Sequence, residues 1–147
     1  PFFRISVNGA VPDVVPTGLR AMIKKLVKAQ TPVHFPCEGE TKTRRYRKAL
    51  EGVRVVVRES AFTLKRFMES DDPVSWAAGK DIEKTIDRLN EARAIAKAKN
   101  AQGQKTLVCP ATAEAVLYRR RKNKRSKCGA CTACSDKSVK GVVYVWH

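Results

Sequence analysis

The sequence predicts a small α+β domain with short strands and two main helices, followed by a basic C-terminal segment held by a metal ion. Apolar residues recur at helical spacing in residues 18–30 and about 80–101, which predicts the two helices. Apolar and polar residues alternate in residues 2–8, and a last apolar run follows at 142–146, which predicts strands. With 147 residues, of which 43% are hydrophobic, the chain can build one compact domain and a tail.

The chain is predicted to divide into a compact domain and an extension. Residues 1–108 hold both main helices and a basic segment at 42–58. Residues 109–147 hold a second basic tract, most of the cysteines and the terminal strand. Residues 68–100 carry 6 basic and 7 acidic side chains, so we interpret them as scaffold rather than binding surface.

The first elements are a strand and a helix. Asn8-Gly9 is a turn signal after the strand at 2–8, and it predicts a short return strand over Val11–Val15. Thr17 is predicted to cap the helix at 18–30, which has one apolar and one basic face. The basic face carries Arg20, Lys24, Lys25 and Lys28.

The middle of the chain alternates between loops and short elements. Residues 31–42 contain two prolines and a glycine and are predicted to form a loop. A strand is predicted at 53–58, with valines on one face and Arg54 and Arg58 on the other, where the arginines can contact a nucleic-acid backbone. Ser60 is predicted to cap a short helix at 61–69.

The second half begins with a connector over residues 73–79. A short strand is predicted at 107–109, and a helical turn at 113–118 after Thr112. The second main helix, about 80–101, is predicted to face inward with Ile82, Ile86, Leu89 and Ile95.

The charge of the chain is strongly positive. It has 30 Lys and Arg against 14 Asp and Glu, which gives a formal net charge of +16. Nucleic acid is the commonest partner of such a surface. A membrane surface fits less well, because the basic residues are spread over several segments, and no apolar run approaches the roughly 20 residues that span a bilayer.

Two basic runs are the candidate nucleic-acid contacts, and Tyr46 and Tyr118 beside them are candidates for stacking on bases. Lys and Arg that neutralise phosphates release counterions and give salt-sensitive binding. The first run also includes Lys42. The predicted contacts are Arg44, Arg45, Arg47, Lys48, Arg119, Arg120, Arg121, Lys122, Lys124, Arg125 and Lys127.

The cysteines suggest a metal site. Cys128, Cys131 and Cys134 are spaced by three residues, which suits metal ligands better than disulfides. Zinc requires a fourth ligand, and we take Cys109 as the first choice. The alternatives are Cys37, His34 and His147.

Residues 127–141 (KCGACTACSDKSVKG) resemble part of the CXXC-type zinc-finger domains, which bind unmethylated CpG DNA. Those domains carry two cysteine knuckles and distal cysteines, whereas this chain has one knuckle. The resemblance covers about 15 residues and implies zinc ligation by the cysteines of the knuckle.

The same cysteines also resemble the cluster ligands of bacterial-type ferredoxins. Those proteins combine a CxxCxxC run with a remote Cys followed by Pro, and Cys109-Pro110 matches the remote pair in reversed order. The resemblance implies an iron–sulfur cluster as the alternative to zinc, in a structural role.

Together these features predict a structural nucleic-acid-binding protein and not an enzyme. Size and composition resemble those of ribosomal proteins, so we expect an RNA-binding component of a mitochondrial or cytoplasmic ribosome, or of a similar particle, with neighbouring proteins as further partners. The first alternative is a DNA-binding or packaging protein of chromatin or a virus. The second is a structural component of a capsid or another protein assembly. No arrangement of nucleophile and base, and no phosphate-binding glycine loop, predicts catalysis.

Overall fold

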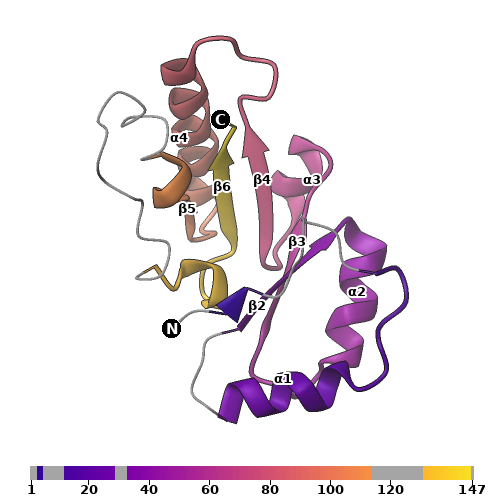
Figure 1. The fold of residues 1–147 in the computed structure, drawn as a ribbon. Helices are drawn as coiled ribbons and strands as arrows, with labels where there is room; N and C mark the ends of the chain where they lie inside the picture. Colours follow the sequence, from indigo (N-terminus) through magenta and orange to yellow (C-terminus); the bar gives the residue numbers. More distant parts are fainter. Residues whose placement is uncertain (1–2, 5–11, 29–32, 114–130, 147) are drawn as a thin grey trace, which may run out of the picture.

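The computed structural model describes residues 3–4, 12–28, 33–113 and 131–146, which form helices around a sheet (Figure 1). The mixture of helices and strands confirms the predicted α+β class. The strands are β1 (Phe3–Arg4), β2 (Val33–Glu38), β3 (Val56–Ser60), β4 (Val74–Ala78), β5 (Thr106–Val108) and β6 (Gly141–Val145). The helices are α1 (Leu19–Lys28), α2 (Glu40–Ala49), α3 (Leu64–Glu69), α4 (Thr85–Ala101) and the short 3-10 helix η2 (Ala133–Ser135).

The six strands form one sheet in the order β1-β2-β3-β4-β6-β5, and every neighbouring pair is parallel. Parallel strands need crossover connections. Each of the first four connections along the chain, from β1 to β5, contains one of the helices α1 to α4. Strand β6 lies between β4 and β5, so the predicted extension, residues 109–147, shares its sheet with residues 1–108. The sequence patterns contain no signal for an entirely parallel sheet.

The strand register separates the side chains of the sheet into two faces. Partners on adjacent parallel strands point to the same side, and Glu59 pairs with Val74 while Trp76 pairs with Val143. Helices α1 to α4 pack on this side, which we call the helix face. The other side carries Arg58, Ser75 and Val142 and is contacted by η2, so we call it the turn face.

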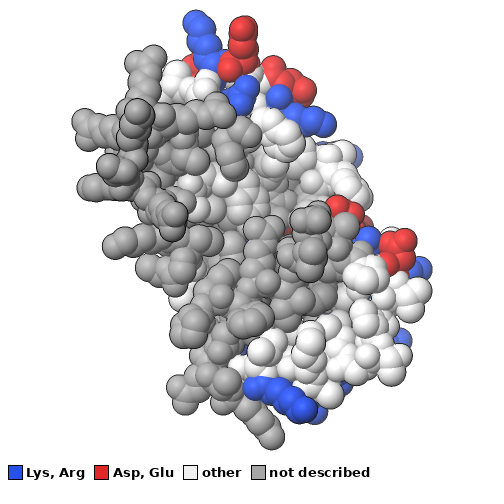
Figure 2. Space-filling view, in the orientation of Figure 1, with Lys and Arg blue, Asp and Glu red and all other residues white. Residues whose placement is uncertain are grey.

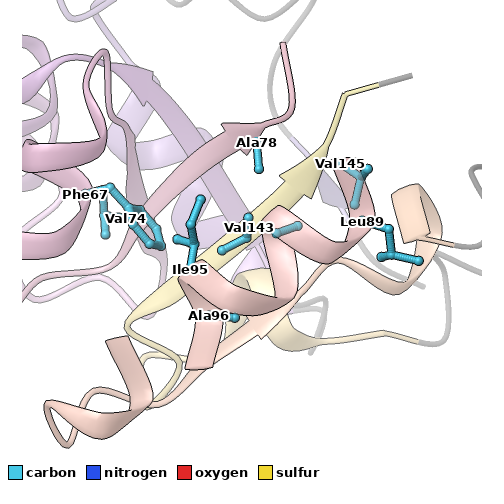
Figure 3. Close-up of a cluster of buried hydrophobic side chains, with 9 residues drawn as sticks. Phe67, Val74, Ala78, Leu89, Ile95, Ala96, Val143 and Val145 are labelled. Carbon is cyan, nitrogen blue, oxygen red and sulfur yellow. The ribbon is translucent and has the colours of Figure 1, made fainter. Parts of the chain in front are cut away.

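Two apolar clusters fill the helix face. The first joins α1 and α2 to the sheet through Leu19, Ile23, Cys37, Tyr46, Leu50, Val53, Val55 and Val57. The second joins α3 and α4 to β4 and β6 (Figure 3) through Phe67, Val74, Ala78, Leu89, Ala92, Ile95, Ala96, Val143 and Val145. The spacing of Leu89, Ala92 and Ala96 places them on the side of α4 that lies over the sheet.

Two of the predicted connections are strands in the structure. Residues 31–42 were predicted to form a loop, but they contain β2 and the beginning of α2. Pro36 is tolerated there because the described pairing of β1 with β2 ends at His34. The predicted connector at 73–79 contains β4, which is buried between β3 and β6. Its run of small and apolar residues is typical of a strand that is covered on both faces.

Several other predictions differ from the structure. Residues 12–15 contain no strand, and β1 instead pairs in parallel with β2, while residues 5–11 with the Asn8-Gly9 turn lie outside the described residues. Thr63 rather than Ser60 caps the short helix, because its hydroxyl accepts a hydrogen bond from the Arg66 amide at 3.2 Å. Ile86 was predicted to face inward, but it lies in the first turn of α4 and is 49% exposed.

The strongest periodic segments are confirmed. The helix predicted at 18–30 is α1, and the helix predicted at about 80–101 is α4, which begins later, at Thr85. The short strand predicted at 107–109 is β5, and the terminal strand is β6. Within the described part of the chain, no helix is long and apolar enough to cross a bilayer.

Candidate metal centre and nucleic-acid surface

Two of the predicted metal ligands, Cys109 and Cys134, lie in one small apolar cluster on the turn face, at the β5 side of the sheet. Cys109 follows β5, is buried, and donates its amide to the Val143 carbonyl at 2.8 Å. Cys134 lies in η2, and its half-buried side chain packs against the cluster that contains Cys109. The fold therefore brings Cys109 to one cysteine of the knuckle.

Cys37 lies on the other side of the sheet. It is fully buried in the helix-face cluster with Tyr46, and burial raises the pKa of its thiol to about 12. The sheet thus separates Cys37 from Cys134, which favours Cys109 as the fourth ligand. Cys128 and His147, and the side chain of His34, lie outside the described residues.

Polar groups surround the Cys134 thiol. The Tyr144 hydroxyl lies 3.5 Å from Cys134 Sγ, within hydrogen-bonding distance for sulfur. Burial raises the pKa of Cys134, while the contact with Tyr144 and the positive charge of Arg58 lower it. Groups that favour the thiolate are typical of the second shell of a metal site.

The described thiols fit part of a metal site. Zinc and iron–sulfur clusters both take cysteine thiolates, and zinc takes four ligands in a tetrahedron. Among the residues with described positions, no three His, Cys, Asp or Glu side chains are close enough to hold an ion by themselves. The predicted site also includes Cys128, which lies outside that set. The metal site therefore remains a prediction from the spacing of the cysteines in the sequence.

The basic run at 42–48 lies on α2, where its members have different surroundings. Arg44, Arg45 and Lys48 are exposed, and Arg45 donates to the Asp13 carbonyl at 3.5 Å. Arg47 instead binds the Asp72 carboxylate at 2.7 Å and the carbonyls of β3 and Pro73. Arg47 therefore joins α2 to the sheet, and the other three are the candidates for phosphate contacts.

Helix α1 extends this basic surface. Lys24 and Lys25 are exposed, and Arg20 donates to the carbonyl of Ala49 at the end of α2 at 3.0 Å. Basic side chains are visible over α1 at the lower edge of the molecule (Figure 2). Because Arg20 bridges the two helices, we call the exposed cations of α1 and α2 the basic surface: Arg20, Lys24, Lys25, Arg44, Arg45 and Lys48.

The remaining candidate residues have other environments. The C-terminal basic tract, Arg119 to Lys127, and Tyr118 lie outside the described residues. Tyr46 is not available for stacking on bases, because its ring is fully buried and its hydroxyl donates to the Pro12 carbonyl at 2.8 Å. Arg58 was predicted to face a nucleic-acid backbone, but it is fully buried on the turn face. One sequence signal points to its burial: Val55, Val56 and Val57 precede it, so both faces of this strand carry valines.

Comparison with protein families, with curated proteins and with solved structures returned no match for this chain.

Proposed function

We propose that this protein is a structural nucleic-acid-binding protein, specifically an RNA-binding component of a ribosome or a ribosome-like particle. The observation that carries the proposal is the formal net charge of +16. A polyanion compensates such charge, and each neutralised phosphate adds binding free energy through counterion release. On this proposal the protein works in a mitochondrial or cytoplasmic ribosome, beside other proteins of the particle.

The basic surface supports the proposal. Lys24, Lys25, Arg44 and Lys48 form no ion pair with another described residue. Acidic residues accompany many of the other cations, as in the pairs of Lys42 with Asp13 and of Arg47 with Asp72. These four cations therefore have no described acidic partner that competes with phosphates.

The second part of the proposal is a structural zinc ion, or alternatively an iron–sulfur cluster, held by Cys109, Cys128, Cys131 and Cys134. The basic tract lies between Cys109 and Cys128 in the sequence. An ion bound by both cysteines would close residues 110–127 into a loop and reduce the conformational entropy that the tract loses on binding RNA. No catalytic step belongs to this proposal.

The test measures binding of the full chain to single-stranded RNA, duplex RNA and duplex DNA over a range of salt concentrations, by fluorescence anisotropy. A variant with Lys24→Gln, Arg44→Gln and Lys48→Gln should lower the salt slope by about 0.7 for each lost contact to single-stranded RNA. A variant with Arg119→Gln, Arg120→Gln and Arg121→Gln tests the tract in the same way.

The matched control removes exposed cations from α4, within the near-neutral segment 68–100, as Arg93→Gln and Lys97→Gln, and should leave the slope unchanged. Equal slopes for all variants would remove both basic regions from the interface. Tighter binding to DNA than to RNA at equal salt would favour the DNA-packaging alternative, which the CXXC-like knuckle suggests. No binding to any nucleic acid would favour a role in a protein assembly.

A further inference from the structure

Two exposed aromatic rings lie where the parallel strands end. Because all the strands run in one direction, β3, β4 and β6 end at the same edge of the sheet, which we call the carboxyl edge (Figure 1). Phe62 follows β3 by two residues and is 73% exposed, and Trp146 follows β6 directly and is 46% exposed. Among the side chains with described burial, these are the exposed aromatic rings.

The Phe62 ring lies over the beginning of α2. Gly39 is the N-cap of this helix, and a Cβ added to it would lie 2.7 Å from Phe62 Cε2. The amide of Ala61, directly before Phe62, donates to the Ser75 carbonyl of β4 at 2.9 Å. The glycine thus leaves room for the ring beside the backbone of α2, while most of the ring stays open to a partner.

The backbone of Trp146 is bound on two sides. Its amide donates to the Ala78 carbonyl at the end of β4 at 2.9 Å, and its carbonyl accepts a hydrogen bond from Arg88 Nη1 of α4 at 3.3 Å. These contacts hold the main chain at the end of β6 and leave the indole partly exposed. The ring is therefore presented from a fixed position on the sheet.

Strand β6 also ends where the order of the strands reverses. Helix α4 leaves β4 on the helix face, and the connection from β5 returns through η2 on the turn face to β6, which lies between β4 and β5. In open α/β sheets, ligands bind outside the carboxyl ends of the strands at such a reversal. Trp146 lies at this point.

The basic surface continues to the carboxyl edge along α2. Glu40, the first residue of α2, lies 3.7 Å from Arg66 of α3, and Arg44 is one turn further along the same side of the helix. Arg44 is exposed and lies about 7.5 Å along the helix axis from Gly39. A strand of RNA whose phosphate contacts Arg44 therefore has neighbouring bases within reach of the Phe62 ring.

We infer that the carboxyl edge binds unpaired bases of RNA, which stack on Phe62 and Trp146. This inference rests on the proposed RNA binding and adds that the target is single-stranded, because a duplex hides its base faces whereas unpaired bases stack on aromatic side chains. Strand β4 lies between β3 and β6, so the two attachment points are about 10 Å apart across the sheet and take different bases. The net charge of +16 favours this anionic partner over an apolar protein surface.

The test compares the affinity of the full chain for single-stranded polyuridylate RNA and for duplex RNA. Phe62→Ala and Trp146→Ala should each weaken binding to polyuridylate roughly 5–150-fold, the loss typical of one stacked base. The salt slope should stay the same, because neither ring neutralises a phosphate. Affinity for duplex RNA should change little.

Substitutions at the same edge serve as matched controls. Phe62→Tyr keeps the ring and should bind polyuridylate as the wild type does, whereas Phe62→Leu keeps an apolar side chain without the ring and should bind as weakly as Phe62→Ala. Leu64→Ala removes an aliphatic side chain that is 40% exposed beside Phe62 and should leave the affinity unchanged.

Tryptophan fluorescence observes the second ring directly. The chain has two tryptophans, and Trp76 packs against the helix-face cluster. Trp76→Phe therefore leaves Trp146 as the single fluorophore. Polyuridylate should quench this emission by stacking on the indole, and duplex RNA should not.

The outcomes separate this inference from the proposed function. RNA binding with equal affinity in Phe62→Ala, Trp146→Ala and wild type would overturn the stacking site and leave the proposed function in place. Binding by Phe62→Leu that equals the wild type, or emission of Trp146 that polyuridylate does not change, would overturn the role of that ring. Self-association of the wild type in sedimentation, lost in Phe62→Ala while RNA affinity is unchanged, would assign the edge to a contact between copies. A chain that binds no RNA would overturn both proposals.

Discussion

The two faces of the sheet are stabilised by different chemistry. The helix face buries large apolar side chains from amphipathic helices, such as Ile23, Phe67 and Leu89, against the valines of the strands. The turn face has a small apolar cluster around Val139 and Val142, and at its centre lies a buried arginine that binds carbonyls. Helices α1 to α4 all pack on the other face, and on the turn face the hydrogen bonds of Arg58 to backbone carbonyls hold the turn in place.

Among the described residues, each face also contains one buried cation, and the two differ in what surrounds them. On the helix face, Lys99 Nζ donates to the carbonyls of Phe67 at 2.7 Å, Met68 at 3.2 Å and Ser70 at 2.9 Å, at the end of α3. A cation is favourable there because the helix dipole is negative at its C-terminus, and the Phe67 ring lies 5.1 Å from the ammonium. Lys99 therefore completes a helix end, whereas Arg58 holds a turn that carries thiols.

The largest expected effect is on the helix face. Phe67→Ala should lower the free energy of unfolding by about 3–5 kcal/mol, because it removes a fully buried ring between α3, α4 and the sheet. Urea unfolding measures the change. Leu64→Ala, in the same helix but 40% exposed, is the control and should cost far less. Equal costs for the two variants would show that the helix face is not the main core.

Removal of the Lys99 ammonium tests the first buried cation. Lys99→Met should lower the free energy of unfolding by about 3 kcal/mol, because three carbonyls lose their donor and an unsatisfied buried group costs roughly 1–3 kcal/mol. Lys97→Met, which changes an exposed lysine of the same helix, should stay within about 0.5 kcal/mol. A Lys99→Met protein as stable as the control would mean that the end of α3 finds other donors.

Metal removal is the corresponding test of the turn face. If the centre binds an ion that is present at 100 times its dissociation constant, chelation should lower the free energy of unfolding by about 2.7 kcal/mol. Hydrogen exchange should accelerate in residues 133–145 and remain slow in α1, which packs on the other face. Faster exchange throughout the chain would contradict a separate stabilisation of the two faces.

The contrast between the faces also explains what the sequence could predict. Helices α1 and α4 were predictable, because their apolar residues recur at helical spacing, and strand β6 because it is a short apolar run. Strands β2 and β4 were not, since Pro36 in β2 resembles a loop signal and the short β4 mixes Ser75 and alanines with Trp76 without a clear period.

The candidate site was also predictable only in part. The choice of Cys109 over Cys37 came from the chemistry of the residues, and the structure places Cys109 beside Cys134. The role of Arg58 was not predictable, because its acceptors are backbone carbonyls from residues 74 and 133–140, and no side-chain pattern reports them. Contacts between a side chain and a distant backbone appear only once the topology is known.

The smallest expected effect concerns the point where the helix face meets the end of β2. Gly39 caps α2 with a φ of 71°, and an added Cβ would lie 2.7 Å from Phe62 Cε2. Gly39 also has a ψ of 164°, a backbone conformation that is nearly exclusive to glycine and costs another residue about 1–3 kcal/mol, so Gly39→Ala should lower the free energy of unfolding by about that amount. The Phe62 ring is 73% exposed and can move away, so it should add little.

Gly103→Ala separates the two contributions, because Gly103 has a φ of 78° and open space around its Cβ position. Its cost in urea unfolding measures the backbone conformation alone. The double variant Gly39→Ala with Phe62→Ala, measured against Phe62→Ala alone, should then give the backbone cost at Gly39 without the Phe62 ring. If Gly39→Ala costs much more than Gly103→Ala and the second substitution restores the difference, Phe62 is held rigidly over α2 despite its exposure, and the helix face extends beyond the buried clusters.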